Sequence, residues 1–302
     1  MSLSNNAMKQ VVVRFYAEAN RANLAIFDEV FAQDFASYGG AGDMRGAEAF
    51  RGLYRQLLAA FPDLTFRVEQ LIADGDRCGV RGTLSGTHAG NFMGIAPPTN
   101  KFVSFTGTSI YRFDEAGLFQ TRWEEWDGLQ AMQQMGLIPT PPGGDAHLPV
   151  PVPPYVVGRT SSPSENAAMV RRFIEEVWNK GNLDVADEIF HAEATSPSAP
   201  MLPKGPAAVK ILTTMFRTAM PDYHMDIIDL LADGDYVLAR FTQSGTQTGE
   251  LMGMPATGKK ATWGEMGILR FAGGQVVESW YNVDMLGMFQ QLGMGGDGAA
   301  KG

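Results

Sequence analysis

The most constraining feature of this sequence is a long stretch that occurs twice. Residues 61–94 read FPDLTFRVEQLIADGDRCGVRGTLSGTHAGNFMG, and residues 220–253 read MPDYHMDIIDLLADGDYVLARFTQSGTQTGELMG. Both copies carry Pro-Asp, Asp-Gly-Asp, Gly-Thr and Met-Gly at matching positions. Aligned over about 130 residues, the copies share roughly a third of their residues, so the chain is an internal repeat. A chain of 302 residues with such a repeat is expected to form two domains.

The same helix stops and turns punctuate both copies. Pro62 and Pro221 end the helix that precedes them, because the ring removes a donor and clashes with the previous turn. Asp-Gly-Asp at 74–76 and 233–235 supplies the glycine that a tight hairpin needs. Ser162-Pro163-Ser164-Glu165 has the sequence of a capping box and begins the first helix of copy two.

Hydrophobic periodicity predicts helices first and strands afterwards. Helical spacing covers residues 7–22, 25–31, 47–60 and 129–135, and in copy two 163–178, 185–190, 206–219 and 285–292. A period of two predicts strands over residues 64–73, 77–88, 101–113 and 118–127, and in copy two 223–232, 236–247, 260–271 and 275–284. Helices followed by antiparallel strands indicate the α+β class, with helices on one face of each sheet.

These elements divide the chain into domain 1, residues 5–138, and domain 2, residues 163–294. A proline-rich linker is expected over 139–162 and a disordered tail over 295–302. The net charge of −9 without a basic cluster argues against nucleic acid or a membrane as partner. The single cysteine, Cys78, is expected to be buried in a strand, and a cytoplasmic location is the simplest expectation.

Short runs in both copies carry a resemblance to a known family. They are Ala59-Ala60-Phe61-Pro62-Asp63-Leu64, Gly86-Thr87-His88-Ala89-Gly90, Trp123-Glu124-Glu125-Trp126-Asp127, Met252-Gly253-Met254-Pro255 and Trp280 to Asp284. On these runs each copy resembles the SnoaL-like polyketide cyclase family of the nuclear transport factor 2-like superfamily. The resemblance implies two tandem cone-shaped domains, each a curved antiparallel sheet with three helices on one face. Relatives commonly pair through their sheets, so it also implies an intramolecular pseudo-dimer of domains 1 and 2.

The resemblance places a pocket at the mouth of each cone. Many relatives carry a Glu-His-Trp-Asp run on the last strand, where this chain has Thr121 to Glu124 and Glu278 to Tyr281. Period-two geometry places Arg122, Glu124 and Trp126 on one face. Glu124 is therefore the candidate base, and Arg122 is a candidate holder of an enolate or carboxylate.

Two interpretations of this pair stay open, since a cation beside Glu124 favours the ionised form and weakens it as a base. The pair is either catalytic or a structural ion pair at the pocket rim. His88 matches a family histidine and is the third catalytic candidate, although a histidine at a strand end is often a hydrogen-bonded rim residue. The substrate-binding candidates are Tyr38, Phe92, Met93, Ser109, Tyr111 and Trp126 in domain 1 and Gln247, Glu265 and Tyr281 in domain 2.

The predicted function is the binding of a small hydrophobic carbonyl compound, polycyclic or polyketide-like, with no cofactor and no metal site. The resemblance favours an enzyme that catalyses proton transfer in domain 1, as in aldol-type cyclisation or isomerisation. Alternatives are a non-catalytic binding protein with a degenerate site, or cofactor-free hydroxylation or epoxide hydrolysis. Domain 2 lacks counterparts of His88, Arg122 and Glu124, so we expect it to be inactive or to bind another ligand.

Overall fold

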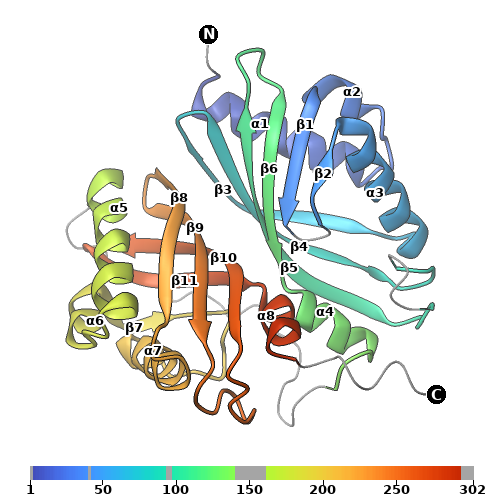
Figure 1. The fold of residues 1–302 in the computed structure, drawn as a ribbon. Helices are drawn as coiled ribbons and strands as arrows, with labels where there is room; N and C mark the ends of the chain where they lie inside the picture. The colour runs from blue at the N-terminus through green and yellow to red at the C-terminus, as the bar shows by residue number, and fades with distance from the viewer. Residues whose placement is uncertain (1–2, 40–41, 93–96, 140–160, 294–302) are drawn as a thin grey trace. The chain divides into compact units, whose positions relative to one another are not determined.

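The computed structural model describes residues 3–39, 42–92, 97–139 and 161–293, which form two compact units divided at residues 145 and 146. Each unit is described separately below (Figure 1). The predicted linker, 139–162, and tail, 295–302, lie almost entirely outside the described residues.

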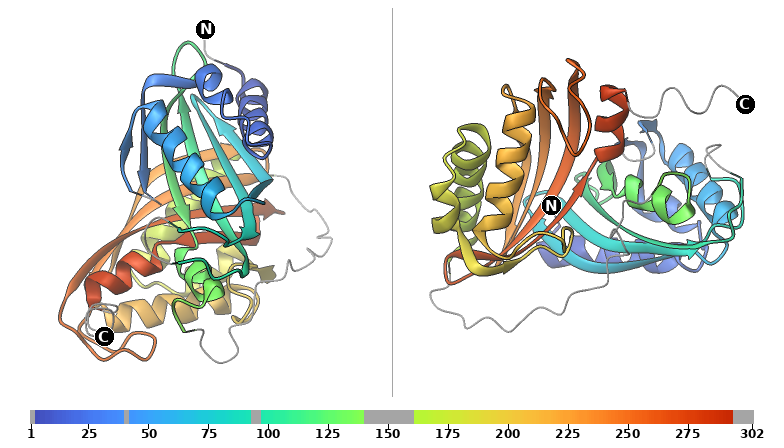
Figure 2. Two further views of the ribbon diagram at one scale, coloured as in Figure 1. Left: turned by 90° about the vertical axis from the view of Figure 1, so that its right-hand side faces the viewer. Right: turned by 90° about the horizontal axis from the view of Figure 1, so that it is seen from below.

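Domain 1 folds as one sheet with helices on a single face. In chain order its elements are α1 Asn5–Ala19, α2 Ile26–Val30, β1 Phe31–Gly39, β2 Met44–Arg45, α3 Ala47–Ala60, β3 Thr65–Asp74, β4 Arg77–Thr87, β5 Phe102–Phe113, β6 Phe119–Trp126 and α4 Gly128–Met135. The strand order is β2-β1-β6-β5-β4-β3, antiparallel except between β1 and β6. The sheet is strongly curved (Figure 2).

Domain 2 repeats this order from α5 onward. Its elements are α5 Pro163–Arg172, the π-helix η1 Phe173–Asn179, α6 Asp184–Ile189, β7 Phe190–Thr195, α7 Pro206–Ala219, β8 His224–Asp233, β9 Tyr236–Thr246, β10 Lys260–Ala272, β11 Gln275–Val283 and α8 Met285–Leu292. The strand order is β7-β11-β10-β9-β8. The capping box at Ser162 and Glu165 is present, as the sequence predicts.

The structure confirms the predicted α+β fold, and every end of the eight predicted strands lies within one residue of its prediction. The strands β1, β2 and β7 were not predicted. β1 and β7 each follow a short helix directly and run parallel to the last long strand of their sheet. The side chains of β1 do not alternate between buried and exposed. Its burial therefore lacks the period-two pattern from which strands are predicted.

The repeated Pro-Asp has a structural role beyond ending a helix. Asp63 accepts hydrogen bonds from the backbone N–H of Thr87 at 2.6 Å and from its hydroxyl at 2.8 Å. Asp222 accepts the same pair from Thr246, at 2.6 and 2.7 Å. The backbone bond, then the hydroxyl bond, lowers the pKa of Asp63. The aspartate therefore fastens the end of β4 or β9 to the loop after the third helix.

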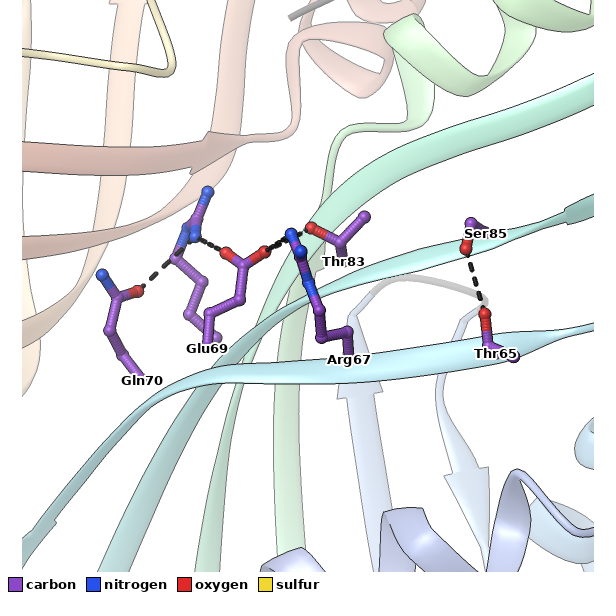
Figure 3. A network of polar contacts seen from close by, with 7 residues as sticks. Thr65, Arg67, Glu69, Gln70, Thr83 and Ser85 are labelled. Atoms are coloured by element: carbon purple, nitrogen blue, oxygen red, sulfur yellow. Dashed lines mark hydrogen bonds and ion pairs between the residues drawn. The ribbon is translucent and has the colours of Figure 1, made fainter. Parts of the chain in front are cut away.

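Register shifts in the long hairpins bend both sheets. β3 and β4 shift between Val68 and Gln70, and β8 and β9 shift at the equivalent place, between Ile227 and Asp229. An extra residue on one strand increases its local twist and bend. On the outer face of β3 and β4, Glu69 accepts from Thr83 at 2.6 Å and pairs with Arg67 and Arg81 (Figure 3). The inner face is apolar and packs against the helices.

Aromatic side chains form the core of domain 1. Phe15 on α1 lies against Phe27, Phe31, Tyr54 and Phe119, with ring centroids 5.1–5.9 Å apart. These rings come from α1, α2, β1, α3 and β6, so the packing fixes the helices over the inner face of the sheet.

Candidate functional site

A cleft lies between α3 and the inner face of the domain 1 sheet. It encloses about 620 Å³ of space not filled by atoms, part of it open to solvent. Its lining is mostly apolar and aromatic: Tyr16, Phe50, Leu53, Tyr54, Leu57, Phe66, Leu84, Phe92, Phe105, Gly107, Arg122, Glu124 and Trp126.

The charged groups of this lining are Arg122 and Glu124, which form an ion pair. As the spacing predicts, they share the inner face of β6 with Trp126. The side chain of Arg122 is 5% exposed and that of Glu124 is 20% exposed, so the carboxylate is the more accessible member. Ser109 donates to Oε1 of Glu124 at 3.3 Å.

Arg122 is held from several sides. Its Nη1 donates to the hydroxyl of Ser37 at 3.3 Å, and its guanidinium lies 4.9 Å from the ring centre of Phe50 and 5.9 Å from that of Tyr111. Its Nε is buried without a hydrogen-bond partner among the described residues. The guanidinium is thus fixed by aromatic packing, with donor capacity left for an anionic ligand oxygen.

Phenol groups surround this pair. The hydroxyls of Tyr16 and Tyr111 are 2.9 Å apart. Burial raises the pKa of Tyr111 and of Tyr54 above their ordinary value. Tyr16 and Tyr54 line the cleft, where a phenol hydroxyl can donate a hydrogen bond. Neither residue was predicted from the sequence as a site residue.

A spacing signal for Tyr54 is present in the sequence. Phe50, Leu53, Tyr54 and Leu57 follow one another at helical intervals on α3, and all four line the cleft. This i, i+3, i+4, i+7 pattern marks the face of a helix that packs on the sheet. No such signal identifies Ser37, because β1 was not predicted.

His88 lies outside the cleft lining and is completely buried. Its Nδ1 accepts from the backbone N–H of Thr99 at 3.3 Å and lies 3.0 Å from the Thr99 hydroxyl. Burial lowers the pKa of His88, so the imidazole is neutral. Its ring centre is 6.3 Å from that of Phe92, which does line the cleft. His88 therefore supports the loop behind the pocket wall.

The other predicted residues of domain 1 divide between the two faces of the sheet. Phe92 and Trp126 line the cleft, and Ser109 and Tyr111 contact the charged pair from β5. Tyr38 stacks on Trp123, with ring centres 6.3 Å apart, and does not line the cleft. Met93 lies outside the described residues.

Domain 2 has a different set of polar groups. Glu265 on β10 lies opposite Val283 on β11, and Tyr281 lies opposite Gly267. A Cβ atom at Gly267 would approach the Tyr281 ring to 2.8 Å, so the glycine makes room for the phenol. Gln247 occupies the position of His88, accepting from the Thr257 hydroxyl at 2.8 Å and donating to the carbonyl of Pro255 at 3.1 Å.

Within the described part of the chain, no three His, Cys, Asp or Glu side chains are grouped so that they could hold a metal ion. None of the described helices is both long and apolar enough to cross a membrane. Cys78 is buried, as predicted.

The fold and the cleft define a two-domain α+β protein with an apolar pocket that contains one ion pair. The chain belongs to the SnoaL-like polyketide cyclase family, whose family model matches residues 10–135 and again residues 168–292. This match confirms the prediction of two tandem SnoaL-like copies.

Similar proteins include two cyclases from Streptomyces. The aklanonic acid methyl ester cyclase DnrD of Streptomyces peucetius is 32% identical over 130 residues, 41% of this chain and 88% of that protein. DauD of Streptomyces sp. strain C5, with the same activity in its name, is 33% identical over 131 residues, 41% of this chain and 80% of that protein. Among solved structures, TsrD from Streptomyces laurentii is 27% identical with a TM-score of 0.41, covering 43% of this chain and 96% of its own.

Proposed function

We propose that domain 1 binds a polycyclic or polyketide-like carbonyl compound and catalyses proton transfer without a cofactor, as in aldol-type cyclisation or isomerisation. The observation that carries this proposal is the Arg122–Glu124 pair in the lining of an apolar cleft. The similar proteins that are named cyclases of aklanonic acid methyl ester support the same reaction class.

The proposed reaction begins with Glu124 as base. Its carboxylate takes a proton from the carbon next to the substrate carbonyl, and the C–H electron pair forms the C=C bond of an enolate. Arg122 stabilises the negative oxygen that results. In a cyclisation, the enolate carbon then attacks a second carbonyl of the same molecule, and the new alkoxide takes the proton back from Glu124.

A substrate oxygen that competes with Glu124 for Arg122 explains how Glu124 could act as a base beside a cation. In the free protein Arg122 pairs with Glu124, which weakens the carboxylate as a base. A substrate oxygen that draws the guanidinium toward itself loosens this pair. Glu124 then becomes a stronger base when the substrate is in place, while the surrounding rings exclude water.

A second candidate function is ligand binding without catalysis. It is favoured by the near-complete burial of Arg122, whose side chain is 5% exposed, and by its fixed packing on Phe50. In that case the ion pair is structural.

Proton exchange in a model ketone tests the proposal. 2-Tetralone is a flat bicyclic ketone whose C1 protons are acidic, so NMR in D₂O reports their replacement by deuterium. We expect the full chain to accelerate this exchange well beyond buffer and beyond an equal amount of heat-unfolded chain. Binding of 2-tetralone with no acceleration would favour the binding-protein function.

We also propose that the two domains pair within one chain, since the duplication supplies both halves of a family dimer. The expected result from light scattering is the mass of a single chain at every protein concentration. A mass of two chains that persists on dilution contradicts this proposal.

A further inference from the structure

Domain 2 contains a polar chain that domain 1 lacks. The Tyr223 hydroxyl donates to Oε1 of Gln243 at 2.6 Å, and the Gln243 amide donates to Oε2 of Glu265 at 2.5 Å. Tyr223 and Gln243 are 3% and 2% exposed, so these bonds lie in the interior. Because the Gln243 carbonyl accepts from Tyr223, its NH₂ group has to face Glu265, which fixes the direction of the chain.

Two of the three equivalent positions of domain 1 lie in the wall of its cleft. By their place in the repeat and their cross-strand partners, Tyr223, Gln243 and Glu265 correspond to Leu64, Leu84 and Gly107. Leu84 and Gly107 line the cleft of domain 1. Domain 2 has therefore replaced an apolar wall by a carboxylate and the groups that orient it.

The second oxygen of Glu265 is available to a ligand. Oε1 accepts no hydrogen bond from the residues that the structure describes, and the side chain stays partly exposed. Two hydrogen-bond donors lie close to Glu265 in strand register, on the same face of the domain 2 sheet. Tyr281 is on β11, two residues from Val283, the strand partner of Glu265. Trp263 is two residues from Glu265 along β10, with a buried Nε1–H that has no acceptor among the described residues.

The electrostatics of Glu265 differ from those of Glu124. Burial raises the pKa of Glu265 to about 7, and the Gln243 bond opposes the shift only partly. The titratable groups around it are Tyr281 on β11 and Tyr223 before β8. Burial raises the pKa of both phenols, and the charge of Arg217 on α7 opposes the shift at Tyr223. None of the described cations forms an ion pair with Glu265, so both protonation states are populated near neutral pH.

We infer that domain 2 holds a second proton-transfer site, in which Glu265 takes a proton from the carbon beside the carbonyl of an uncharged, apolar ketone or ester. The C–H bond breaks, its electron pair forms C=C, and the carbonyl becomes an enolate oxygen that accepts from Tyr281. Return of the proton from Glu265 to carbon completes the cycle. This site does not depend on Glu124 or Arg122, and it revises the expectation that domain 2 is inactive.

The test uses the full chain, 2-tetralone in D₂O and three substitutions. In the Glu124→Gln chain we expect 2-tetralone to exchange faster than in buffer alone. Adding Glu265→Gln should lower this remaining exchange rate about 10²–10⁴-fold. Glu250→Gln, an exposed glutamate of the same domain, should change nothing. Residual exchange that survives Glu265→Gln, or that is absent in the Glu124→Gln chain, overturns the inference. If instead Glu124→Gln has no effect in the Glu265→Gln background, the domain 1 proposal fails, and the domain 2 proposal is judged by its own comparison.

Two further measurements do not depend on turnover. In a chain labelled with ¹³C at glutamate carboxyl carbons, the signal lost in Glu265→Gln should titrate near pH 7, and Gln243→Leu should move that midpoint upward. The pKa of Glu265 in the folded chain lies above its ordinary value of 4.5. Its contribution to the free energy of unfolding is therefore fully present below pH 4.5 and is lost as the pH rises through 7. As the pH rises through this range, the melting temperature of the Glu265→Gln variant should therefore increase relative to that of the native chain. A midpoint near 4.5 and parallel melting curves contradict the inference.

Discussion

Replacing Glu124 by Gln should lower the rate of the proposed proton abstraction in domain 1 about 10²–10⁴-fold, and we expect ligand affinity to change little. The amide keeps the shape of the side chain and its contact with Ser109, but it cannot take up a proton. The exchange of 2-tetralone in D₂O measures the rate, and fluorescence of the cleft residue Trp126 measures binding. Because domain 2 carries its own proposed site, the comparison is made in the Glu265→Gln background.

Glu125→Gln is the matched control, since Glu125 follows Glu124 on β6 and points to the opposite face of the sheet. It makes the same chemical change in the same strand without reaching the cleft. We expect its exchange rate to equal that of the parent chain. Equal rates in both variants would remove Glu124 from the proposed mechanism.

The sequence predicts the fold well because the turn residues of one copy recur at matching positions in the other. Asp-Gly-Asp recurs with glycine at a positive φ, +63° at Gly75 and +57° at Gly234, so each hairpin is found by turn chemistry and by repetition. β1 and β7 each pair in parallel with a strand far along the chain, and local periodicity does not reveal such a partner.

The candidate site could be predicted only in part. Arg122 and Glu124 share a strand, so their common face follows from the spacing alone. The phenols and Ser37 reach the same place from α1, α3 and β1, and contacts across elements are not encoded in any local pattern. The Tyr223–Gln243–Glu265 chain joins three separate segments in the same way. The sequence did offer one signal for this chain: copy two has polar residues at strand positions where copy one is apolar.

The second large effect is on stability: Arg122→Met should lower the free energy of unfolding of domain 1 by about 3 kcal/mol. Methionine keeps the contact with Phe50 but leaves Glu124 without its charged partner. The exposed side of Glu124 allows some rehydration, which places the loss at the low end of that expected for a broken buried pair. Denaturant unfolding of the full chain measures it. Arg14→Met, in an ion pair whose side chains are 56% and 52% exposed, should cost less than about 1 kcal/mol.

The double variant Arg122→Met/Glu124→Gln separates structure from catalysis. It removes both charges, so we expect it to recover most of the stability lost in Arg122→Met, with a coupling of about 1–3 kcal/mol. Recovery of stability without recovery of 2-tetralone exchange means that the pair is needed for the reaction itself. If exchange in domain 1 returns together with stability, the pair acts only by holding β6 and β1 in place, and Glu124 is not the base of domain 1.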